Sequence, residues 1–251
     1  MVFSTPKEDW EFNVLDIYNF NRQGKLSKYF EFIEKNHNNL DGDICEVGVY
    51  RGHSIIATGL FLRQIGSSKK IYGFDSFSGF PAYHDYDDLA FFDSLHQQGI
   101  IDSIHLEKVK LNLKYKSLFS SVESTPSNIS SSGDFSSTSK ELLEKKIDFF
   151  NLENIVLIDG SYSETMIIEN SNERKFMAVL MDCDLYESHK IALEYTWENL
   201  TKGGYMYLDE YYSLKFPGAR YAIHNFFLSR TQKPSMHEKI DGDFERWFVK
   251  K

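Results

Sequence analysis

The chain has 251 residues, of which 41% are hydrophobic and 16% aromatic, with 15 Gly and 5 Pro. This composition is typical of a globular protein and excludes a collagen-like repeat, a coiled coil and a disordered chain. The 37 acidic residues outnumber the 28 Lys and Arg, for a net charge of -9. That balance argues against nucleic acid or an anionic membrane as the main partner, because phosphate binding needs clustered basic side chains.

Cysteine content and the length of the apolar runs bear on the compartment. Cys45 and Cys183 are the two cysteines, too few for a disulfide framework. Residues 1–9 carry charge before any apolar run, unlike a signal peptide. No stretch approaches the roughly 18 to 20 apolar residues that span a bilayer. We therefore expect a cytoplasmic protein with no membrane partner.

The first 39 residues are rich in Phe and Tyr. They predict one or two helices that form a cap over the rest of the fold. Aromatic helices of this kind could also bury a surface against a second copy of the chain, so a homo-oligomer is one expectation.

From residue 43 onward, short apolar runs alternate with amphipathic runs. The apolar runs predict strands at residues 43–47, 70–75, 154–158, 177–181 and 205–208. The amphipathic runs predict helices at residues 54–62, 139–150, 187–200 and 219–226. The turn signal Asp241-Gly242 predicts a closing antiparallel hairpin of residues 235–240 and 245–249. We therefore expect one α/β domain over residues 1–251, with a doubly wound, seven-stranded and mostly parallel sheet.

Two segments fall outside this alternation. Residues 117–139 contain 11 Ser and predict a loop, which we interpret as a linker or lid. Residues 82–106 follow Pro81 and form an insertion that could cover a ligand pocket as a lid.

The first predicted strand leads into a glycine-containing turn, EVGVYRGHS at residues 46–54. Gly48 and Gly52 allow the backbone to approach a ligand closely. The dinucleotide fingerprint G-x-G-x-x-G and the phosphate-binding P-loop are both absent. A nicotinamide cofactor or ATP is therefore disfavoured.

Carboxylates stand at the ends of the first two strands. Glu46 would suit a cationic group such as an amino-acid ammonium, and Asp75 stands where such folds place an acid on ribose hydroxyls. Together they indicate an adenosine ligand with a positively charged appendage and no phosphate, a description that S-adenosylmethionine fits. The alternative is that each carboxylate is merely solvated or caps a helix.

A second acidic group follows the fourth and fifth predicted strands. Asp182 and Asp184 come after the strand at 177–181, and Asp209 and Glu210 after the strand at 205–208. Converging carboxylates repel one another unless a cation or raised pKa values relieve them. Hard oxygen ligands favour Mg²⁺ or a similar divalent cation. Alternatively, Asp182 or Asp184 caps the helix that begins near Ser188.

Four segments resemble the macrocin O-methyltransferase family, whose members act on deoxysugars of macrolide and aminocoumarin antibiotics. They are GDICEVGVYRG at 42–52, YGFDSFSGFP at 72–81, MDCDLYES at 181–188 and GGYMYLDEY at 203–211. The resemblance covers about residues 40 to 250. It implies a class I methyltransferase fold, S-adenosylmethionine as the cofactor and a divalent metal, usually Mg²⁺.

The resemblance also implies roles for individual residues. The loop at 46–54 would hold the methionine part of the cofactor and Asp75 the ribose, with residues 133–136 and 159–162 near the adenine. The implied cofactor contacts are Glu46, Gly48, Val49, Tyr50, Arg51, Gly52, Ser54, Asp75, Ser76, Asp134, Phe135, Ser136, Asp159, Gly160 and Ser161. The implied metal ligands are Asp182, Asp209 and Glu210, with Asp184 close behind.

This chain departs from the family pattern at three positions. Glu210 stands where the family usually has Asp, His53 where it often has Gly, and Cys183 where Gly is common. The longer arm of Glu210 changes the geometry of that ligand.

The implied reaction is methylation of a hydroxyl on a sugar-containing acceptor. The metal would bind two vicinal hydroxyls and lower the pKa of one, and Asp182 or Asp184 would take the proton. The alkoxide would attack the sulfonium methyl in line. Catechol-type methyltransferases place a Lys base just after the metal-binding Asp, and residues 183–189 contain no Lys.

Two other functions fit part of the pattern. Asp182-Cys183-Asp184 is also the kind of metal motif that nucleotide-sugar glycosyltransferases use, although no Glu-x-Gly loop precedes it there. The chain could also be an inactive S-adenosylmethionine-binding relative. Product analysis separates the three: S-adenosylhomocysteine, a nucleoside diphosphate, or neither.

Overall fold

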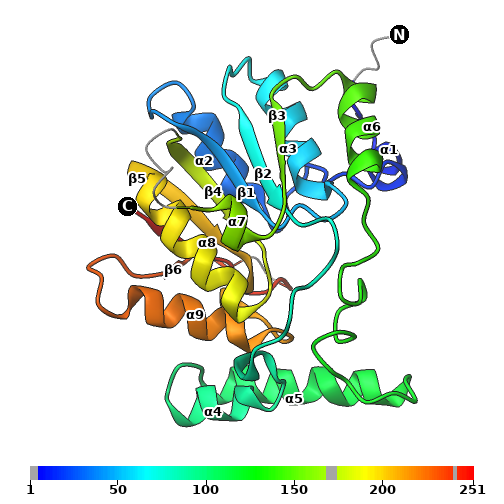
Figure 1. The fold of residues 1–251 in the computed structure, drawn as a ribbon, viewed down its shortest axis with the longest axis vertical. Helices are drawn as coiled ribbons and strands as arrows, with labels where there is room; N and C mark the ends of the chain where they lie inside the picture. Colours follow the sequence, from blue (N-terminus) through cyan, green and yellow to red (C-terminus); the bar gives the residue numbers. More distant parts are fainter. Residues whose placement is uncertain (1–4, 168–173, 240–241) are drawn as a thin grey trace.

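The computed structural model describes residues 5–167, 174–239 and 242–251, so residues 1–4 of the expected cap and Asp241 of the expected turn lie outside it. Its seven-stranded sheet has the order β3-β2-β1-β4-β5-β7-β6 (Figure 1). Neighbours among β1 to β5 run parallel, and β7 runs antiparallel to both β5 and β6. This confirms the doubly wound, seven-stranded α/β fold. The strands are β1 (Asp43–Val47), β2 (Ile71–Asp75), β3 (Ile155–Asp159), β4 (Phe176–Met181), β5 (Leu200–Leu208), β6 (Ser235–Met236) and β7 (Trp247–Lys250).

Helices cover both faces of the sheet and extend beyond one of its ends (Figure 1). No helix among the described residues is long and apolar enough to cross a membrane. The helices are α1 (Asp9–Val14), α2 (Ser27–Asn36), α3 (His53–Gln64), α4 (Phe91–Gln97), α5 (Ser103–Leu118), α6 (Lys140–Phe150), α7 (Tyr162–Thr165), α8 (Tyr186–Asn199) and α9 (Pro217–Leu228), with short 3-10 turns η1 (Asp85–Asp87) and η3 (Asp209–Tyr212).

The central strands are apolar on both faces because both faces are buried. Every residue of β4 is buried, and its side chains divide between two cores. Ala178 and Leu180 pack with α2 and α3, whereas Val179 and Met181 pack with α8 and α9. A continuously apolar strand is the pattern of a parallel sheet buried on both sides.

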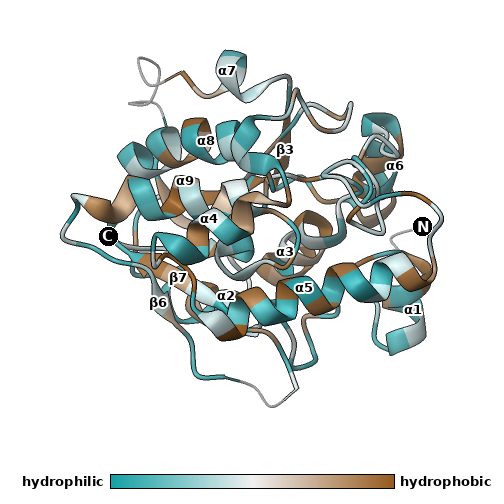
Figure 2. Cartoon of the chain, turned by 90° about the horizontal axis from the view of Figure 1, so that it is seen from below, coloured by the Kyte–Doolittle hydropathy of each residue, from teal (hydrophilic) through white to brown (hydrophobic). Residues whose placement is uncertain are grey.

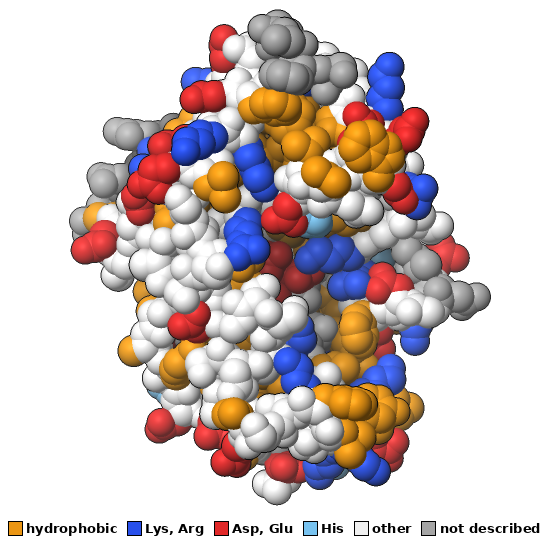
Figure 3. Space-filling view, turned by 90° about the vertical axis from the view of Figure 1, so that its right-hand side faces the viewer, with side chains coloured by type: hydrophobic (Ala, Val, Ile, Leu, Met, Phe, Trp, Pro, Cys, Tyr) orange, Lys and Arg blue, Asp and Glu red, His pale blue; other side chains and the backbone are white. Residues whose placement is uncertain are grey.

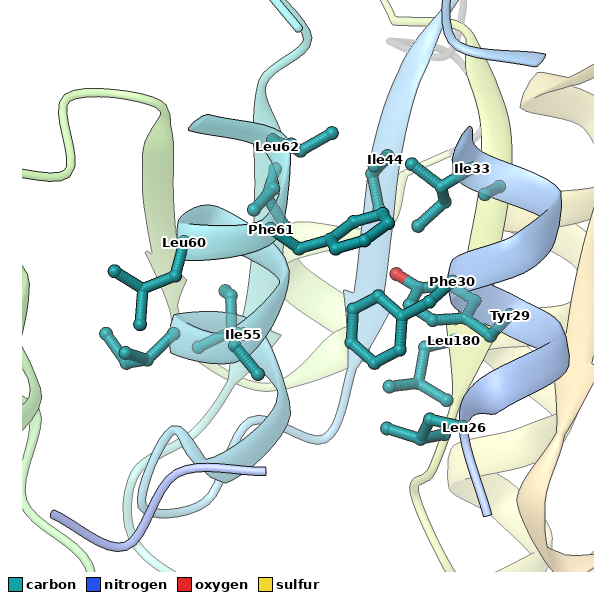
Figure 4. Packing of buried hydrophobic residues seen from close by; sticks show 14 of the residues in the cluster. Leu26, Tyr29, Phe30, Ile33, Ile44, Ile55, Leu60, Phe61, Leu62 and Leu180 are labelled. Carbon is teal, nitrogen blue, oxygen red and sulfur yellow. The ribbon is translucent and has the colours of Figure 1, made fainter. Parts of the chain in front are cut away.

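The expected N-terminal cap lies on one of these faces. Phe30 of α2 and Phe61 of α3 meet over β1 with their ring centroids 4.9 Å apart, beside Ile44 (Figure 4). Tyr29 and Ile33 of α2 are fully buried. Burying a large apolar side chain contributes about 1.5–3 kcal/mol, so this aromatic packing holds the N-terminal segment on the sheet.

The sheet has its switch point between β1 and β4. The chain runs from β1 outward through β2 and β3, then returns to β4 on the other side of β1. The carboxyl ends of these strands therefore meet at one edge. The backbone N–H of Asp182 donates to the carbonyl of Val47 at 3.0 Å, and ligands of such sheets bind at this place.

The structure differs from the sequence prediction in β5, which begins at Leu200 rather than Tyr205. The predicted strand covers residues 205–208 only. In the structure the pairing with β4 shifts between Phe176–Leu200 and Ala178–Tyr205, and Gly203 has a φ of 84°. A positive φ at glycine is the geometry of a bulge, so the Gly203-Gly204 pair bends the strand and does not terminate it.

The insertion at residues 82–106 contains η1, α4 and the start of α5, a helix of 16 residues that the sequence analysis missed. The Asp102 carboxylate caps α5 by accepting the backbone N–H of His105 at 2.7 Å. The carboxylate of Asp87 accepts the backbone N–H of Tyr186 at 2.8 Å. Asp87 thus ties the insertion to the first residue of α8, next to the acidic motif.

Candidate active site

A cavity of about 690 Å³ lies at the carboxyl ends of the strands. This volume is in the usual range for small-molecule sites. Its walls come from the loops after β1, β2, β3 and β4, from the first turns of α8, and from Lys25 near the N-terminus. Figure 3 shows a hollow in the middle of one face, with acidic side chains in its depth and basic side chains beside it.

The loop after β1 passes directly against the loop after β4. Gly48 has a φ of 87°, and a Cβ there would clash with the carbonyl oxygen of Asp182. Gly52 has a φ of 81° and immediately precedes α3. Both positions require glycine, which explains the G-x-x-x-G spacing in physical terms.

Asp75 joins the loops after β1 and β2. Its Oδ2 accepts the backbone N–H groups of Val49 and Tyr50, each at 2.8 Å, and its Oδ1 accepts that of Phe77 at 2.7 Å. A carboxylate has about four acceptor sites. Three are therefore used in holding the loops, and one is left for a ligand hydroxyl in the cavity that Asp75 lines.

Glu46 lies beneath the cavity and not on its wall. Its side chain is fully buried, and its Oε1 accepts the hydroxyl of Ser54, a lining residue, at 2.6 Å. Its Oε2 has no hydrogen-bond partner among the described residues. Burial raises the pKa of Glu46 to about 8.

The opposite wall carries an aromatic surface. Phe135 lines the cavity, with its ring 5.0 Å from that of Tyr50 and 4.9 Å from that of Phe80. The rings are tilted relative to one another, at 77° and 43° to that of Phe135, and aromatic rings on a cavity wall can pack against a planar base. Gly160 and Ser161 line the cavity beyond the end of β3.

The structure brings most of the expected cofactor residues together. Those that line the cavity are Gly48, Val49, Tyr50, Arg51, Ser54, Asp75, Ser76, Phe135, Gly160 and Ser161. Those that do not are Glu46, Gly52, Asp134, Ser136 and Asp159. The last three have other contacts: Asp134 Oδ1 accepts both the N–H and the hydroxyl of Ser136, and Asp159 Oδ2 lies 3.3 Å from Lys140 Nζ.

Three carboxylates form a cluster at the other end of the cavity. Asp182, Asp184 and Glu210 each place an oxygen within 4.8 Å of the others. Burial and the neighbouring Asp209 raise the pKa of Asp182 to about 6. Burial and the surrounding carboxylates raise the pKa values of Asp184 and Glu210 well above their ordinary range. The mutual repulsion of these carboxylates therefore favours the uptake of protons or of a cation.

Lys25 is the functional candidate that the sequence analysis missed. Its Nζ lies 3.4 Å from Asp209 Oδ2 and 3.8 Å from Asp182 Oδ2. Burial acts to raise the pKa of Asp209, but Lys25 and Arg246 hold it below its ordinary value. Lys25 and Asp209 are 184 residues apart, so no local motif signals the contact.

The donor set fits a divalent cation. Asp209 Oδ1 and Glu210 Oε2 are buried and have no hydrogen-bond partner among the described residues. One ammonium cannot neutralise four carboxylates, and clustered oxygens are the ligands that Mg²⁺ prefers. The geometric cluster contains Asp184 in place of the expected Asp209, because Asp209 is turned toward Lys25.

His189 lies behind this cluster. It is fully buried, with its Nδ1 3.1 Å from the carbonyl of Leu185 and its Nε2 3.8 Å from Glu210 Oε2. Burial lowers the pKa of His189 to about 4, so the ring is neutral near pH 7. At 3.8 Å the ring does not hydrogen-bond Glu210, and neither His189 Nε2 nor Glu210 Oε2 has a hydrogen-bond partner among the described residues.

Comparisons with known proteins agree with this architecture. The family model described as "Macrocin-O-methyltransferase (TylF)" matches residues 9–124 and 125–248. A curated relative from Streptomyces olivaceus is 25% identical over 190 residues, which cover 74% of this chain. It is named as an 8-demethyl-8-(2,3-dimethoxy-alpha-L-rhamnosyl)-tetracenomycin-C 4'-O-methyltransferase, and the match spans 58% of its length.

Two solved structures share the fold. The O-methyltransferase NovP is 19% identical with a TM-score of 0.58, covering 89% of this chain and 79% of its own. The calicheamicin methyltransferase CalS11 is 21% identical with a TM-score of 0.56, covering 90% of this chain and 76% of its own. The family model spans nearly the whole sequence and includes every segment that forms the cavity. The chain belongs to the macrocin O-methyltransferase family.

Proposed function

We propose that this chain transfers a methyl group from S-adenosylmethionine to a hydroxyl of a sugar-containing small molecule, with a divalent cation such as Mg²⁺ bound at the acidic cluster. The main supporting observation is that the loop at 48–51, Asp75, Asp182 and Asp184 all line one cavity. A site for an adenosine ligand and a site for a hydroxyl-binding cation therefore open into the same space. The curated relative's name, a methyltransferase for a rhamnosyl compound, supports a sugar as the acceptor.

We call the part of the cavity formed by the loops after β1, β2 and β3 the cofactor half. Backbone N–H groups fix its shape. The loop at 48–51 is fixed by Asp75, whose remaining acceptor site is free for a ribose hydroxyl. The rings of Phe135 and Tyr50, which both line the cavity, would pack against the adenine. Ser54, at the start of α3, lines the cavity, and its hydroxyl donates a hydrogen bond to Glu46.

We call the part of the site formed by Asp182, Asp184, Asp209 and Glu210 the acidic half. It would supply the groups that bind and deprotonate the acceptor. Asp182 and Glu210 of the cluster would hold the cation, joined by Asp209 in place of its contact with Lys25. The bound cation would lower the pKa of a hydroxyl beside it. Asp182 and Asp184 are the carboxylates of this group that line the cavity, so either can reach an acceptor hydroxyl. Asp184 is the better placed as the base, since the carboxylate of Asp182 also contacts Lys25.

The first test is calorimetric titration of the purified protein with S-adenosylhomocysteine, and separately with Mn²⁺ as the probe for the cation. We expect micromolar binding of S-adenosylhomocysteine and one strong Mn²⁺ site. Absence of S-adenosylhomocysteine binding with and without Mn²⁺ would overturn the proposal.

Product analysis is the second test. The protein is incubated with S-adenosylmethionine and a panel of nucleotide sugars and glycosides, and S-adenosylhomocysteine and methylated sugar are measured by mass spectrometry. Release of a nucleoside diphosphate instead would favour a glycosyltransferase that uses Asp182 and Asp184. Cofactor binding without turnover on any acceptor, together with no Mn²⁺ site, would indicate an inactive relative.

A further inference from the structure

Helix α5 has apolar side chains on two opposite sides. One side packs on the body of the protein through Val109 and His105, which are buried, and through Leu106 and Leu113, which are partly buried. The other side is open. It carries four large side chains that are between 44% and 63% exposed: Ile104, Leu111, Tyr115 and Leu118.

These four residues form a continuous stripe. Their spacing of seven, four and three residues places them on one side of a helix with 3.6 residues per turn. Brown segments recur along α5 in Figure 2, where the helix lies at the near surface. Phe119 and Val122, just beyond the helix, are 91% and 65% exposed. An exposed apolar patch of this kind marks an interaction surface.

The lysines of α5 argue against a lipid surface as the partner. A helix that lies on an anionic membrane presents its basic side chains to the headgroups. Here Lys110 Nζ lies 3.0 Å from Asp93 and Lys116 Nζ donates to the carbonyl of Asn128. Lys108 Nζ lies 5.5 Å from the centre of the Tyr212 ring. Three of the four lysines of α5 therefore have contacts within the chain. The fourth, Lys114, lies on the same side of the helix as the acidic Glu107, so little unmatched basic charge is left for anionic headgroups.

The stripe is self-complementary. Ile104 and Leu118 each lie seven residues from Leu111, so antiparallel pairing about Leu111 sets Ile104 of each copy against Leu118 of the other. Glu107 and Lys114 are exposed and lie together on one side of the stripe. Neither takes part in an ion pair among the described residues. The same pairing brings Glu107 of each copy beside Lys114 of the other.

We propose that α5 pairs antiparallel with α5 of a second copy of this chain, about a two-fold axis at Leu111. A two-fold contact uses the same patch on both copies, which this charge pattern satisfies. The pairing also shields the stripe from water. This inference is independent of the proposed activity, because it uses none of the residues that line the cavity.

The test is sedimentation velocity over a wide range of concentrations. We expect the wild-type protein to sediment as a dimer of 29.3 kDa chains. Leu111→Glu should give monomers, because it places two like charges on the axis. The matched control is Ser117→Glu, which adds the same charge to an exposed position on another side of the helix and should leave the dimer intact. Circular dichroism reports whether each variant is folded.

Variants that exchange the charges of Glu107 and Lys114 distinguish loss of pairing from a folding defect. Glu107→Lys alone and Lys114→Glu alone should each weaken the dimer at least about tenfold, whereas the double variant should restore it. A wild-type protein that is monomeric throughout, or a dimer indifferent to Leu111→Glu, would overturn the proposal. So would a monomer that floats with phosphatidylglycerol vesicles, which would assign the stripe to a lipid surface.

Discussion

The carboxylates at the two ends of the cavity have different surroundings: hydrogen-bond donors surround Asp75, whereas other carboxylates surround Asp182. Asp75, in the cofactor half, accepts three backbone N–H groups and is fixed by them. Asp182, Asp184 and Glu210, in the acidic half, each place an oxygen within 4.8 Å of the others, and the ammonium of Lys25 lies 3.8 Å from Asp182. Backbone donors preorganise the first half before any ligand arrives. In the acidic half the carboxylates repel one another, and a bound cation can relieve that repulsion.

This difference predicts different responses to substitution. Changes in the cofactor half should alter affinity for the adenosine ligand through loop geometry. Changes in the acidic half should alter cation binding and proton transfer through charge. The variants below test that separation, beginning with the largest expected effect.

Asp182→Asn should abolish turnover and weaken Mn²⁺ binding by more than about 100-fold, because it removes a ligand charge at the centre of the cluster. Asp184→Asn is its matched partner. It should retain Mn²⁺ and lower turnover by about 10² to 10⁴, since it removes the proposed base. Calorimetry with Mn²⁺ and single-turnover kinetics separate the two effects. Full activity in Asp184→Asn would leave Asp182 as the sole candidate for the base.

Asp75→Asn should weaken S-adenosylhomocysteine binding by about 10-fold to 100-fold. An amide cannot accept N–H groups on both arms, so the loop at 48–51 loses part of its anchorage. The same variant should bind Mn²⁺ as the wild-type protein does, because Asp75 is not part of the acidic cluster. Calorimetric titration with each ligand checks both statements. A loss of Mn²⁺ affinity equal to the loss of S-adenosylhomocysteine affinity would show that the halves are not separate.

Lys25→Met should tighten Mn²⁺ binding by about tenfold, because it removes an ammonium that competes for Asp182 and Asp209. Lys28→Met is the control, since Lys28 pairs with Glu31 on the surface of α2 and should change Mn²⁺ affinity little. Electron paramagnetic resonance of Mn²⁺ gives the affinities directly. Weaker Mn²⁺ binding in Lys25→Met would instead mean that the ammonium helps to assemble the cluster.

The same contrast explains what the sequence could predict. The motifs after β1, β2 and β4 are local, and strand ends of a doubly wound sheet share one edge. Asp75, Asp182 and Gly48 were therefore placed correctly at one edge from residue type and position. Lys25 could not be placed, because it reaches the cluster only through the packing of α2 on the sheet.

Helix α5 and the first part of strand β5, residues 200–204, were not predicted, for a related reason. Amphipathic periodicity marks a helix only when one side is polar, and α5 is apolar on two sides. The Gly203-Gly204 pair has the composition of a turn, but cross-strand pairing with β4 carries the strand through it. In both cases tertiary contacts override the local signal.

Glu46→Gln tests the cofactor half through the pH dependence of the protein's stability, and we expect it to have the smallest effect of these variants. The pKa of Glu46 rises from 4.5 to about 8 on folding because the side chain is buried. A group whose pKa is raised on folding stabilises the protein below its unfolded value, and this stability is lost as pH rises through the folded value. Urea unfolding of the wild-type protein should therefore show falling stability between pH 4.5 and about 8. Glu46→Gln should fall less over the same window, whereas Glu144→Gln, at an exposed position of α6, should follow the wild type. Equal slopes in all three proteins would mean that Glu46 titrates as a solvated carboxylate, and that the floor of the cofactor half is open to water.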